Sequence, residues 1–253
     1  MPHIDISHLT TNGKTILLAC DQGMEHGPED FNEKNIDPNY VYQIGIRNGL
    51  NAVIFGRGIS ERYHQEYKND IQLIVKLNGH TRFNKPNSWG KQNCSVEEAI
   101  RFGAVGVGYT IHIGAGHEAE QMQEFSGIVS AAHANGIPAI AWVYPRGEQI
   151  KDEKTPELCA YAARIGLELG ADMVKVYNPG NEGALRWVNM SAGNTKVIIS
   201  GGDQVSPEEY AEQCKGIMRA GITGIAVGRN VWQAEDPDKV CTLIKDVIYN
   251  GNY

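Results

Sequence analysis

Eight short apolar runs, spread over the whole chain, place the strongest limit on what this sequence can fold into. Each run has four to seven residues and is rich in Val, Ile, Leu or Ala, as is typical of parallel strands buried on both faces. The stretches between the runs have helical patterns. The runs are Thr15–Asp21, Ala52–Phe55, Leu73–Leu77, Ala104–Tyr109, Ala139–Tyr144, Met173–Val176, Val197–Ser200 and Gly224–Val227.

Helix starts can be recognised between several of these runs. The segment 93–98 offers a cap followed by acidic residues of a first turn, and Thr155-Pro156 and Ser206-Pro207 each place proline just inside a helix start. Eight buried strands, each followed by a helix or loop, predict an α/β fold with a single closed (β/α)8 TIM barrel. An open doubly wound sheet is the alternative, but it usually has fewer strands.

No linker, low-complexity tract or charge run divides the 253 residues. Barrels of this length are routinely single domains, so we expect one catalytic domain over residues 1–253. The segment from Lys76 to Cys94 contains scattered Gly and Pro residues and is expected to form an irregular loop over one barrel end. Trp89 within it is either a lid contact or, as we favour, a packing anchor.

The charge balance excludes one large class of partner. The chain has 23 Lys and Arg against 30 Asp and Glu, a net charge of −7, and no basic stripe, so nucleic acid is not an expected partner. No signal peptide is recognisable, and no apolar run is long enough to cross a bilayer. We therefore expect a cytoplasmic protein with no membrane partner. The five cysteines are scattered and show no paired metal spacing.

Lys175 is the residue that most directly suggests a chemistry. It lies in the apolar segment Ala171–Tyr177, where a long charged side chain is out of place unless it has a partner or a task. Burial disfavours the ammonium, so such a lysine can become a nucleophile near neutral pH and form a Schiff base. Lys76 and Arg146 would help to lower its pKa, whereas a nearby Asp21 would oppose them. The alternative is an edge strand with the lysine in water.

Polar and reactive residues collect at the ends of the predicted strands where the active sites of such barrels lie. Alternate residues of a strand share a face, so Tyr144 shares one with Trp142 and Arg146, and Lys175 shares one with Tyr177. If Lys175 points into the barrel, Tyr144 can lie beside it, and a phenol beside an amine is a plausible proton-transfer pair. The alternative for Tyr144 is a core tyrosine with its hydroxyl bonded to the backbone.

Two glycine-rich segments follow the seventh and eighth strands. They are Ser200-Gly201-Gly202 and Val227-Gly228-Arg229-Asn230. Loops at these positions commonly form the phosphate site of a barrel, because glycine lets backbone N–H groups approach the phosphate oxygens. Arg229 would add a fork of charged donors. Plain turns are the alternative for each segment taken alone.

Taken together, these residues resemble the archaeal-type class I fructose-bisphosphate aldolases, a family that includes the bacterial DhnA-like enzymes. The matching motifs run in order over almost the whole chain. They are the segment Leu18–Pro28, the segment Val75–Gly79, Gly108-Tyr109-Thr110, the segment Trp142–Gly147, Tyr161-Ala162-Ala163-Arg164, Lys175, Ser200-Gly201-Gly202 and the segment Ala226–Asn230.

The resemblance implies a barrel enzyme that reversibly cleaves fructose 1,6-bisphosphate to dihydroxyacetone phosphate and glyceraldehyde 3-phosphate, with no metal or other cofactor. It implies Lys175 as the Schiff-base lysine, Tyr144 as the general acid/base and Asp21 as an assisting carboxylate. The substrate and phosphate residues it implies are Ser200, Gly201, Gly202, Gly228 and Arg229 for the ketone-side phosphate, Arg146 and His26 for the far phosphate, and Trp142 and Lys76. It also implies a homo-oligomer, up to a large ring of subunits.

One position departs from the family pattern. The family usually has histidine after the first-strand aspartate, where this chain has Gln22. An imidazole can carry charge or a proton near neutral pH and an amide cannot, so the change could slow the reaction or favour another sugar phosphate. If the histidine only orients the aspartate, glutamine can replace its hydrogen bond. We expect this milder effect.

Three other functions remain open on the sequence. A transaldolase-like synthase or a thiolase of the same family would use the same lysine on another phosphorylated sugar. A metal-dependent aldolase would need clustered histidine ligands, but the eight histidines, including His64, His80, His112, His117 and His133, show no tight ligand spacing. Most of the histidines are expected on the surface or in loops. A non-catalytic phosphosugar-binding protein would not need the lysine and tyrosine.

Overall fold

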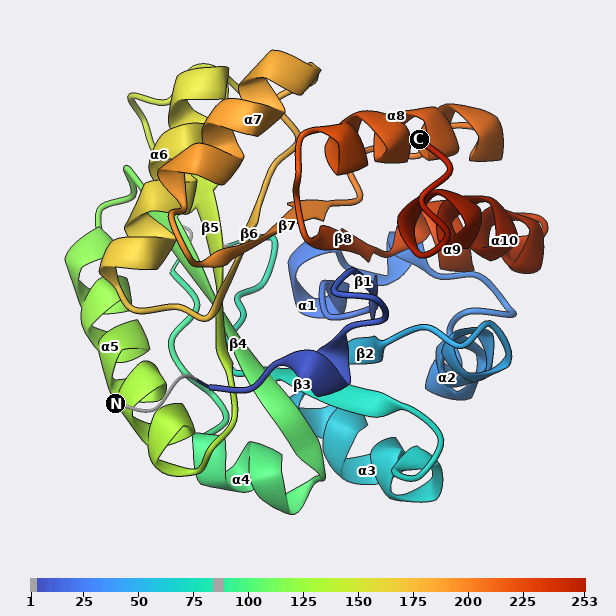
Figure 1. The fold of residues 1–253 in the computed structure, drawn as a ribbon. Coiled ribbons are helices and arrows are strands. Elements are labelled where there is room, and N and C mark those ends of the chain that lie inside the picture. Colours follow the sequence, from blue (N-terminus) through green and yellow to red (C-terminus); the bar gives the residue numbers. More distant parts are fainter. Residues whose placement is uncertain (1–3, 84–88) are drawn as a thin grey trace.

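The computed structural model describes residues 4–83 and 89–253. Eight parallel strands close into a barrel, and helices pack around its outside (Figure 1). The strands are β1 (Thr15–Ala19), β2 (Ala52–Gly56), β3 (Gln72–Lys76), β4 (Ala104–Ile113), β5 (Ala139–Pro145), β6 (Met173–Val176), β7 (Lys196–Ser200) and β8 (Gly224–Val227).

The α-helices are α1 (Gly23–His26), α2 (Pro38–Arg47), α3 (Arg57–Tyr67), α4 (Val96–Arg101), α5 (Glu118–Ala134), α6 (Pro156–Glu168), α7 (Glu182–Ser191), α8 (Pro207–Arg219), α9 (Arg229–Trp232) and α10 (Pro237–Ile248). Two short 3-10 helices, η1 (Ser7–Leu9) and η2 (Pro28–Asp30), complete the set among the described residues.

The helix starts expected from the sequence are present. Ser95 and Ser206 form capping boxes at α4 and α8, and the Thr155 hydroxyl accepts from the Leu158 N–H at the start of α6.

The barrel closes because β1 pairs in parallel with both β2 and β8. The predicted closed (β/α)8 barrel is therefore confirmed, and the open sheet is not what forms. The largest difference from the expected strands is in β4, which continues to Ile113 because it stays paired with β5 as far as Pro145. In addition, β1 ends at Ala19, so Asp21 lies in the loop that follows it.

The strands bury both faces, and each face belongs to a different core. Side chains on the outer face pack against the helices, whereas Leu17, Ile54 and Met173 are among those that fill the barrel interior. Trp142 belongs to the interior, and a Cβ at Gly108 would lie 1.4 Å from its indole ring. Gly108 therefore lets the Trp142 indole lie across the barrel. The next interior positions toward the carboxyl ends of the strands open into the barrel mouth.

The loop after β3 is tied to the barrel by Asn78. Its side-chain amide donates to the carbonyl oxygens of Gly90 and Thr110, at 2.9 and 3.0 Å, and its oxygen accepts from the Thr110 N–H at 2.8 Å. The Trp89 ring stacks on the His117 ring with centroids 4.4 Å apart, as a packing anchor would. Residues 84–88 of the expected loop lie outside the described residues.

Most histidines of the described residues lie at the surface or in loops, as expected: His8, His26, His117 and His133 are at least partly exposed, and His80 is buried in the loop after β3. His64 and His112, in α3 and β4, are buried as well. The His64 ring packs on Tyr42, with centroids 5.9 Å apart, and burial lowers its pKa to about 4, so it is a neutral part of the core.

Within residues 4–83 and 89–253, no group of three or more His, Cys, Asp or Glu side chains could hold a metal ion. In the same residues no helix is long and apolar enough to span a membrane.

Candidate active site

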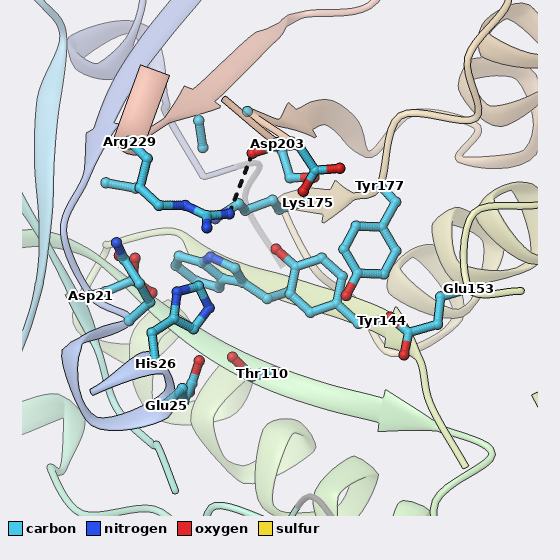
Figure 2. Close-up of a pocket in the computed structure, with 18 of the residues that line it drawn as sticks. Asp21, Glu25, His26, Thr110, Tyr144, Glu153, Lys175, Tyr177, Asp203 and Arg229 are labelled. Atoms are coloured by element: carbon cyan, nitrogen blue, oxygen red, sulfur yellow. Dashed lines mark hydrogen bonds between the residues drawn. The ribbon is translucent and has the colours of Figure 1, made fainter. Parts of the chain in front are cut away.

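A cavity of about 300 Å³ opens at the carboxyl ends of the strands. Figure 2 shows Tyr144 and Lys175 projecting into it, with Tyr177 and Glu153 on one side and Asp21 and His26 on the other. All the site residues expected from the sequence line this one cavity, which brings together segments from both halves of the chain. They are Asp21, His26, Lys76, Trp142, Tyr144, Arg146, Lys175, Ser200, Gly201, Gly202, Gly228 and Arg229.

Lys175 is on β6 and is 8% exposed. Its Nζ lies 5.5 Å from the centre of the Trp142 ring, on the interior face of the barrel. Burial lowers the pKa of the Lys175 ammonium and the positive charge of Lys76 lowers it further, while the carboxylates of Asp21 and Glu25 act in the opposite direction. Burial prevails, so the free amine, which is the nucleophilic form, is reached at a lower pH than for a lysine in water.

Two carboxylates hold a second buried lysine beside the first. The Lys76 Nζ lies 2.6 Å from the Glu25 carboxylate and 3.4 Å from that of Asp21, and the side chains of Lys76 and Asp21 are 4% and 6% exposed. Burial alone would raise the pKa of Asp21, but the charges of Lys76 and Lys175 outweigh it and hold this pKa below its ordinary value. Asp21 is thus a carboxylate next to the amine across the neutral pH range.

Tyr144 is at the end of β5, and its ring stacks on that of Tyr177 with centroids 4.5 Å apart. Burial raises the pKa of the Tyr144 phenol well above its usual range, and the nearby groups of Tyr177 and Asp21 add to the effect. Near neutral pH, Tyr144 is therefore a protonated phenol. Its first proton transfer must be a donation, after which the phenolate can accept a proton from substrate.

The loops after β7 and β8 each begin against the backbone of the next strand. The Gly201 N–H donates to the Ala226 carbonyl of β8 at 2.9 Å, which continues the pairing of β7 with β8. A Cβ on Gly201 would lie 3.1 Å from the Val227 Cα of β8, and one on Gly228 would lie 2.7 Å from the Ala19 carbonyl oxygen of β1. Glycine at these two positions therefore lets each loop lie close to the neighbouring strand.

Polar groups at these loops face the cavity. The Ser200 hydroxyl is buried and has no hydrogen-bond partner in the described part of the chain. Arg229 reaches the carbonyl oxygen of Gly202 at 3.5 Å (Figure 2). These loops can present donors to an anion of the size of a phosphate.

Two further side-chain pairs lie at the cavity, Arg146 with Glu153 on one side and His26 with Asp30 on the other. Arg146 lies 3.7 Å from the Glu153 carboxylate and donates to the Tyr177 hydroxyl at 3.1 Å. His26 lies 2.6 Å from the Asp30 carboxylate. Closer to the solvent, Lys154 and Asp203 form an exposed ion pair at 3.1 Å. Arg146 and His26 are thus available to a second anion only by sharing or exchanging these partners.

Comparison with known proteins identifies the family. The model of the DeoC/LacD family aldolases matches residues 15–234. The "Fructose-bisphosphate aldolase class 1" of Thermoproteus tenax is 43% identical over 94% of this chain and 91% of the relative, and that of Halobacterium salinarum is 38% identical over 96% and 93%. The chain belongs to the class I fructose-bisphosphate aldolase family. The motif-based prediction of membership is confirmed.

Solved structures of aldolases share both the fold and the sequence pattern. One archaeal fructose 1,6-bisphosphate aldolase, solved with its catalytic lysine covalently bound to the carbinolamine intermediate of the substrate, superimposes with a TM-score of 0.91 at 40% identity, over 97% of this chain and 96% of that one. An aldolase from Slackia heliotrinireducens gives a TM-score of 0.88 at 30% identity, over 98% and 84% of the two chains.

Several residues of this aldolase site were not singled out from the sequence. Glu25 and Thr110 line the cavity and lie inside the quoted motifs, but nothing in their spacing reveals that Glu25 pairs with Lys76. Tyr177 was placed on the face of Lys175 by strand alternation, and that signal could have made it a candidate. Asn230 does not line the cavity itself, but its side chain makes three hydrogen bonds to the loop after β7, and only the fold reveals them.

Proposed function

We propose that this protein is a class I aldolase that reversibly cleaves fructose 1,6-bisphosphate to dihydroxyacetone phosphate and glyceraldehyde 3-phosphate through an imine on Lys175. The observation that carries the proposal is the position of Lys175, which is buried in a cavity between a phenol and two glycine-rich loops and has a lowered pKa. The names of the relatives and the shared fold support the same reaction and the same substrate.

The proposed reaction begins with attack of the neutral Lys175 amine on the ketone carbonyl, which gives a carbinolamine. The nitrogen lone pair then expels the hydroxyl group, which leaves as water with the proton of the Tyr144 phenol. The product is an iminium, which is an electron sink, and Tyr144 is left as a phenolate. Asp21 is close enough to Lys175 to favour this positive charge as it develops.

Carbon–carbon cleavage follows from the same two groups. The Tyr144 phenolate accepts the proton of the substrate hydroxyl next to the breaking bond, and the bond electrons move into the iminium. This releases the aldehyde, leaves an enamine on Lys175 and returns Tyr144 to its protonated state. The Tyr144 phenol then donates its proton to the enamine carbon, which regenerates the iminium. Water adds to this iminium and returns a proton to the Tyr144 phenolate, and collapse of the carbinolamine releases the ketone product and restores the amine. The high pKa of Tyr144 favours its reprotonation at the cleavage step.

The two phosphates would occupy opposite ends of the cavity. We assign the ketone-side phosphate to the loops at Ser200–Gly202 and at Gly228 and Arg229, and the far phosphate to Arg146 and His26. Trp142 forms the wall under Lys175. Lys76 was expected to bind substrate, but its ammonium is held by Asp21 and Glu25, so we propose that it acts through its charge on Lys175.

A coupled assay with fructose 1,6-bisphosphate tests the function. Wild type should form both triose phosphates, in the presence of EDTA as well as in its absence, and Lys175→Ala should have no measurable turnover. Full activity of the Lys175→Ala variant would refute the assignment, and loss of wild-type activity in EDTA would favour a metal-dependent aldolase. Calorimetric binding of the sugar phosphate without product would instead favour a non-catalytic binding protein.

A related reaction on another phosphorylated sugar is the second candidate. The observation that favours it is Gln22, which lines the cavity where the family usually has histidine. A Methanocaldococcus jannaschii relative, 35% identical, is named "Fructose-bisphosphate aldolase/6-deoxy-5-ketofructose 1-phosphate synthase". Comparison of kcat/KM for fructose 1,6-bisphosphate with that for other phosphorylated ketoses would decide. We expect fructose 1,6-bisphosphate to be preferred, and Gln22→His to change its kcat/KM by less than about tenfold.

We further propose a cytoplasmic homo-oligomer of single-domain subunits that serves glycolysis or gluconeogenesis. Support for subunit contacts comes from Tyr161 on α6 and from Trp187 and Met190 on α7, large apolar side chains that are exposed in the isolated chain. Native mass spectrometry should give the mass of an assembly of two or more subunits of 27.8 kDa each. A monomer at micromolar concentration would contradict this part of the proposal.

A further inference from the structure

Tyr177 connects two parts of the cavity that the proposed function treats separately. It follows β6 directly, lines the cavity, and stacks its ring on Tyr144 with an angle of 29° between the planes (Figure 2). Its hydroxyl accepts a hydrogen bond from Arg146 at 3.1 Å. One side chain therefore touches both the proposed proton donor and the proposed cation for the far phosphate.

The backbone of Arg146 is fixed independently of Tyr177. The Arg146 N–H donates to the Ile113 carbonyl at 2.8 Å, at the end of β4. A Cβ on the next residue, Gly147, would lie 1.9 Å from the Gly114 carbonyl oxygen, so these two loops are in close contact. What remains to be set is the direction of the guanidinium group. An arginine side chain has several rotatable bonds, and ordering it costs conformational entropy.

The groups that set this direction are Tyr177 and Glu153. Glu153 is the weaker constraint, because its carboxylate is 3.7 Å away and its side chain is 42% exposed. Tyr177 is the stronger one, because its ring is held by the stack on Tyr144 and its hydroxyl is within hydrogen-bond distance. The guanidinium is thus directed by the same ring that packs against the phenol of Tyr144.

A direct part for Tyr177 in proton transfer fits the geometry less well. Burial raises the pKa of its hydroxyl to about 12, and this oxygen already accepts from a cation. A group in this state is a poor base near neutral pH, and the reaction is balanced by Lys175 and Tyr144 without it.

We propose that Tyr177 is a positioning residue that gives this aldolase its selectivity for substrates with a phosphate at the far end. Its hydroxyl holds the Arg146 guanidinium at the place where the far phosphate binds, and its ring fixes the position of this guanidinium relative to the Tyr144 phenol. This inference rests on the proposed function, in which Arg146 binds the far phosphate. A substrate that lacks this phosphate makes no use of the arrangement.

The test compares fructose 1,6-bisphosphate with fructose 1-phosphate, which lacks the far phosphate. Tyr177→Phe keeps the ring and its stack but removes the acceptor for Arg146. The ratio of kcat/KM for the bisphosphate to that for the monophosphate should fall roughly tenfold, mainly through KM for the bisphosphate, as expected for loss of a hydrogen bond to a charged group. Because both substrates are measured on one protein, partial misfolding cancels from the ratio. Tyr253→Phe, the same change at an exposed residue that does not line the cavity, should leave the ratio as in wild type.

A double variant shows whether Tyr177 acts through Arg146. Arg146→Gln should lower the same ratio, and adding Tyr177→Phe to it should lower the ratio no further. An unchanged ratio in Tyr177→Phe, an equal loss on both substrates, or additive losses in the double variant would overturn the inference. Borohydride trapping of wild type at Lys175 separates this failure from failure of the proposed function. If trapping persists while Arg146→Gln keeps the wild-type ratio, the far-phosphate assignment and this inference fall but the aldolase remains.

Discussion

The reactivity of Lys175 depends on a small number of buried charges. Lys76 carries a positive charge that disfavours the Lys175 ammonium, and Asp21 and Glu25 carry negative charges that favour it. Burial is the largest influence and decides the direction. Each neighbouring charge can be removed by one substitution, so the balance can be measured as a shift in pH dependence.

Asp21→Asn should move the pH profile to lower pH. The carboxylate stabilises the Lys175 ammonium, so its removal lowers the pKa of this amine further. The rate constant of borohydride trapping rises with pH as the amine loses its proton, and this rising limb should lie at lower pH than in wild type. Turnover should fall at the same time, because the carboxylate no longer assists the later steps. Asp246→Asn on the exposed side of α10 is the matched control and should leave the limb in place. A limb that moves to higher pH in Asp21→Asn would contradict this account of the charges.

Tyr144→Phe should separate imine formation from cleavage. The substitution keeps the ring and its stack on Tyr177 but removes the acidic proton. Borohydride trapping at Lys175 should persist at a lower rate, because water can replace the phenol as proton donor to the carbinolamine hydroxyl. Steady-state turnover should fall further, by about 10²–10⁴-fold, the usual contribution of a general acid/base, because cleavage also loses its base. Normal turnover in this variant would make Tyr144 a structural residue.

Lys76→Met should destabilise the fold most strongly near neutral pH. The variant leaves Asp21 buried beside Glu25 without the ammonium that compensates both, which costs about 3–5 kcal/mol of unfolding free energy. In wild type the pKa of Asp21 is lowered, so its contribution is present above the unfolded pKa of about 3.9 and is lost as pH falls through the folded value. Without the charge of Lys76, burial raises the pKa of Asp21 in the folded variant, so a proton relieves the unpaired carboxylate at a higher pH than in wild type. The deficit of the variant should therefore shrink as pH falls from about 7 toward about 4 in urea titrations. A deficit that does not change between pH 7 and about 4 would contradict the charge explanation.

At the scale of elements, the phosphate site depends on how two loops are held together. Asn230, in α9, is buried and donates to the carbonyl oxygens of Gly201 and Asp203 at 2.8 and 2.9 Å. Its own oxygen accepts from the Val205 N–H at 2.9 Å. One side chain of α9 thus holds the loop after β7 at three points.

Asn230→Ala should loosen the ketone-side phosphate site. Three backbone groups lose their partner, which should cost about 1–3 kcal/mol of stability and raise the KM for fructose 1,6-bisphosphate and for fructose 1-phosphate alike, since both carry the ketone-side phosphate. Asn135→Ala removes an exposed side chain with one local bond, to the Ala131 carbonyl, and serves as the control. An unchanged KM for both substrates would show that the loops hold their shape without Asn230.

The sequence predicts elements well where local signals decide them. The eight strands are recognisable because both of their faces are apolar, and the starts of α4, α6 and α8 because a capping hydroxyl and an acidic first turn are local features. The end of β4 was missed because its last residues are ordered by pairing with β5, which no local pattern encodes. Asn230 was missed as a support for the same reason, since its partners lie 25 to 29 residues away in the chain.

At the scale of the whole molecule, the barrel converts residues far apart in sequence into one site. The twelve predicted site residues come together because the carboxyl ends of parallel strands meet at one end of a barrel. That much follows from the strand pattern and strand alternation. The pairing of Glu25 with Lys76, across 51 residues, and the stack of Tyr177 on Tyr144 depend on the course of loops and on the registration of β5 with β6. Sequence periodicity carries no information about either.

The central claim is that the Lys175 amine forms the imine with a sugar ketone. Borohydride reduction of the wild-type protein in the presence of fructose 1,6-bisphosphate, followed by proteolysis and peptide mass mapping, tests it directly. The account predicts one stable adduct, on the peptide that contains Lys175, and none in Lys175→Ala. An adduct on Lys76 or on any other lysine instead, or active wild type with no adduct at all, would contradict it.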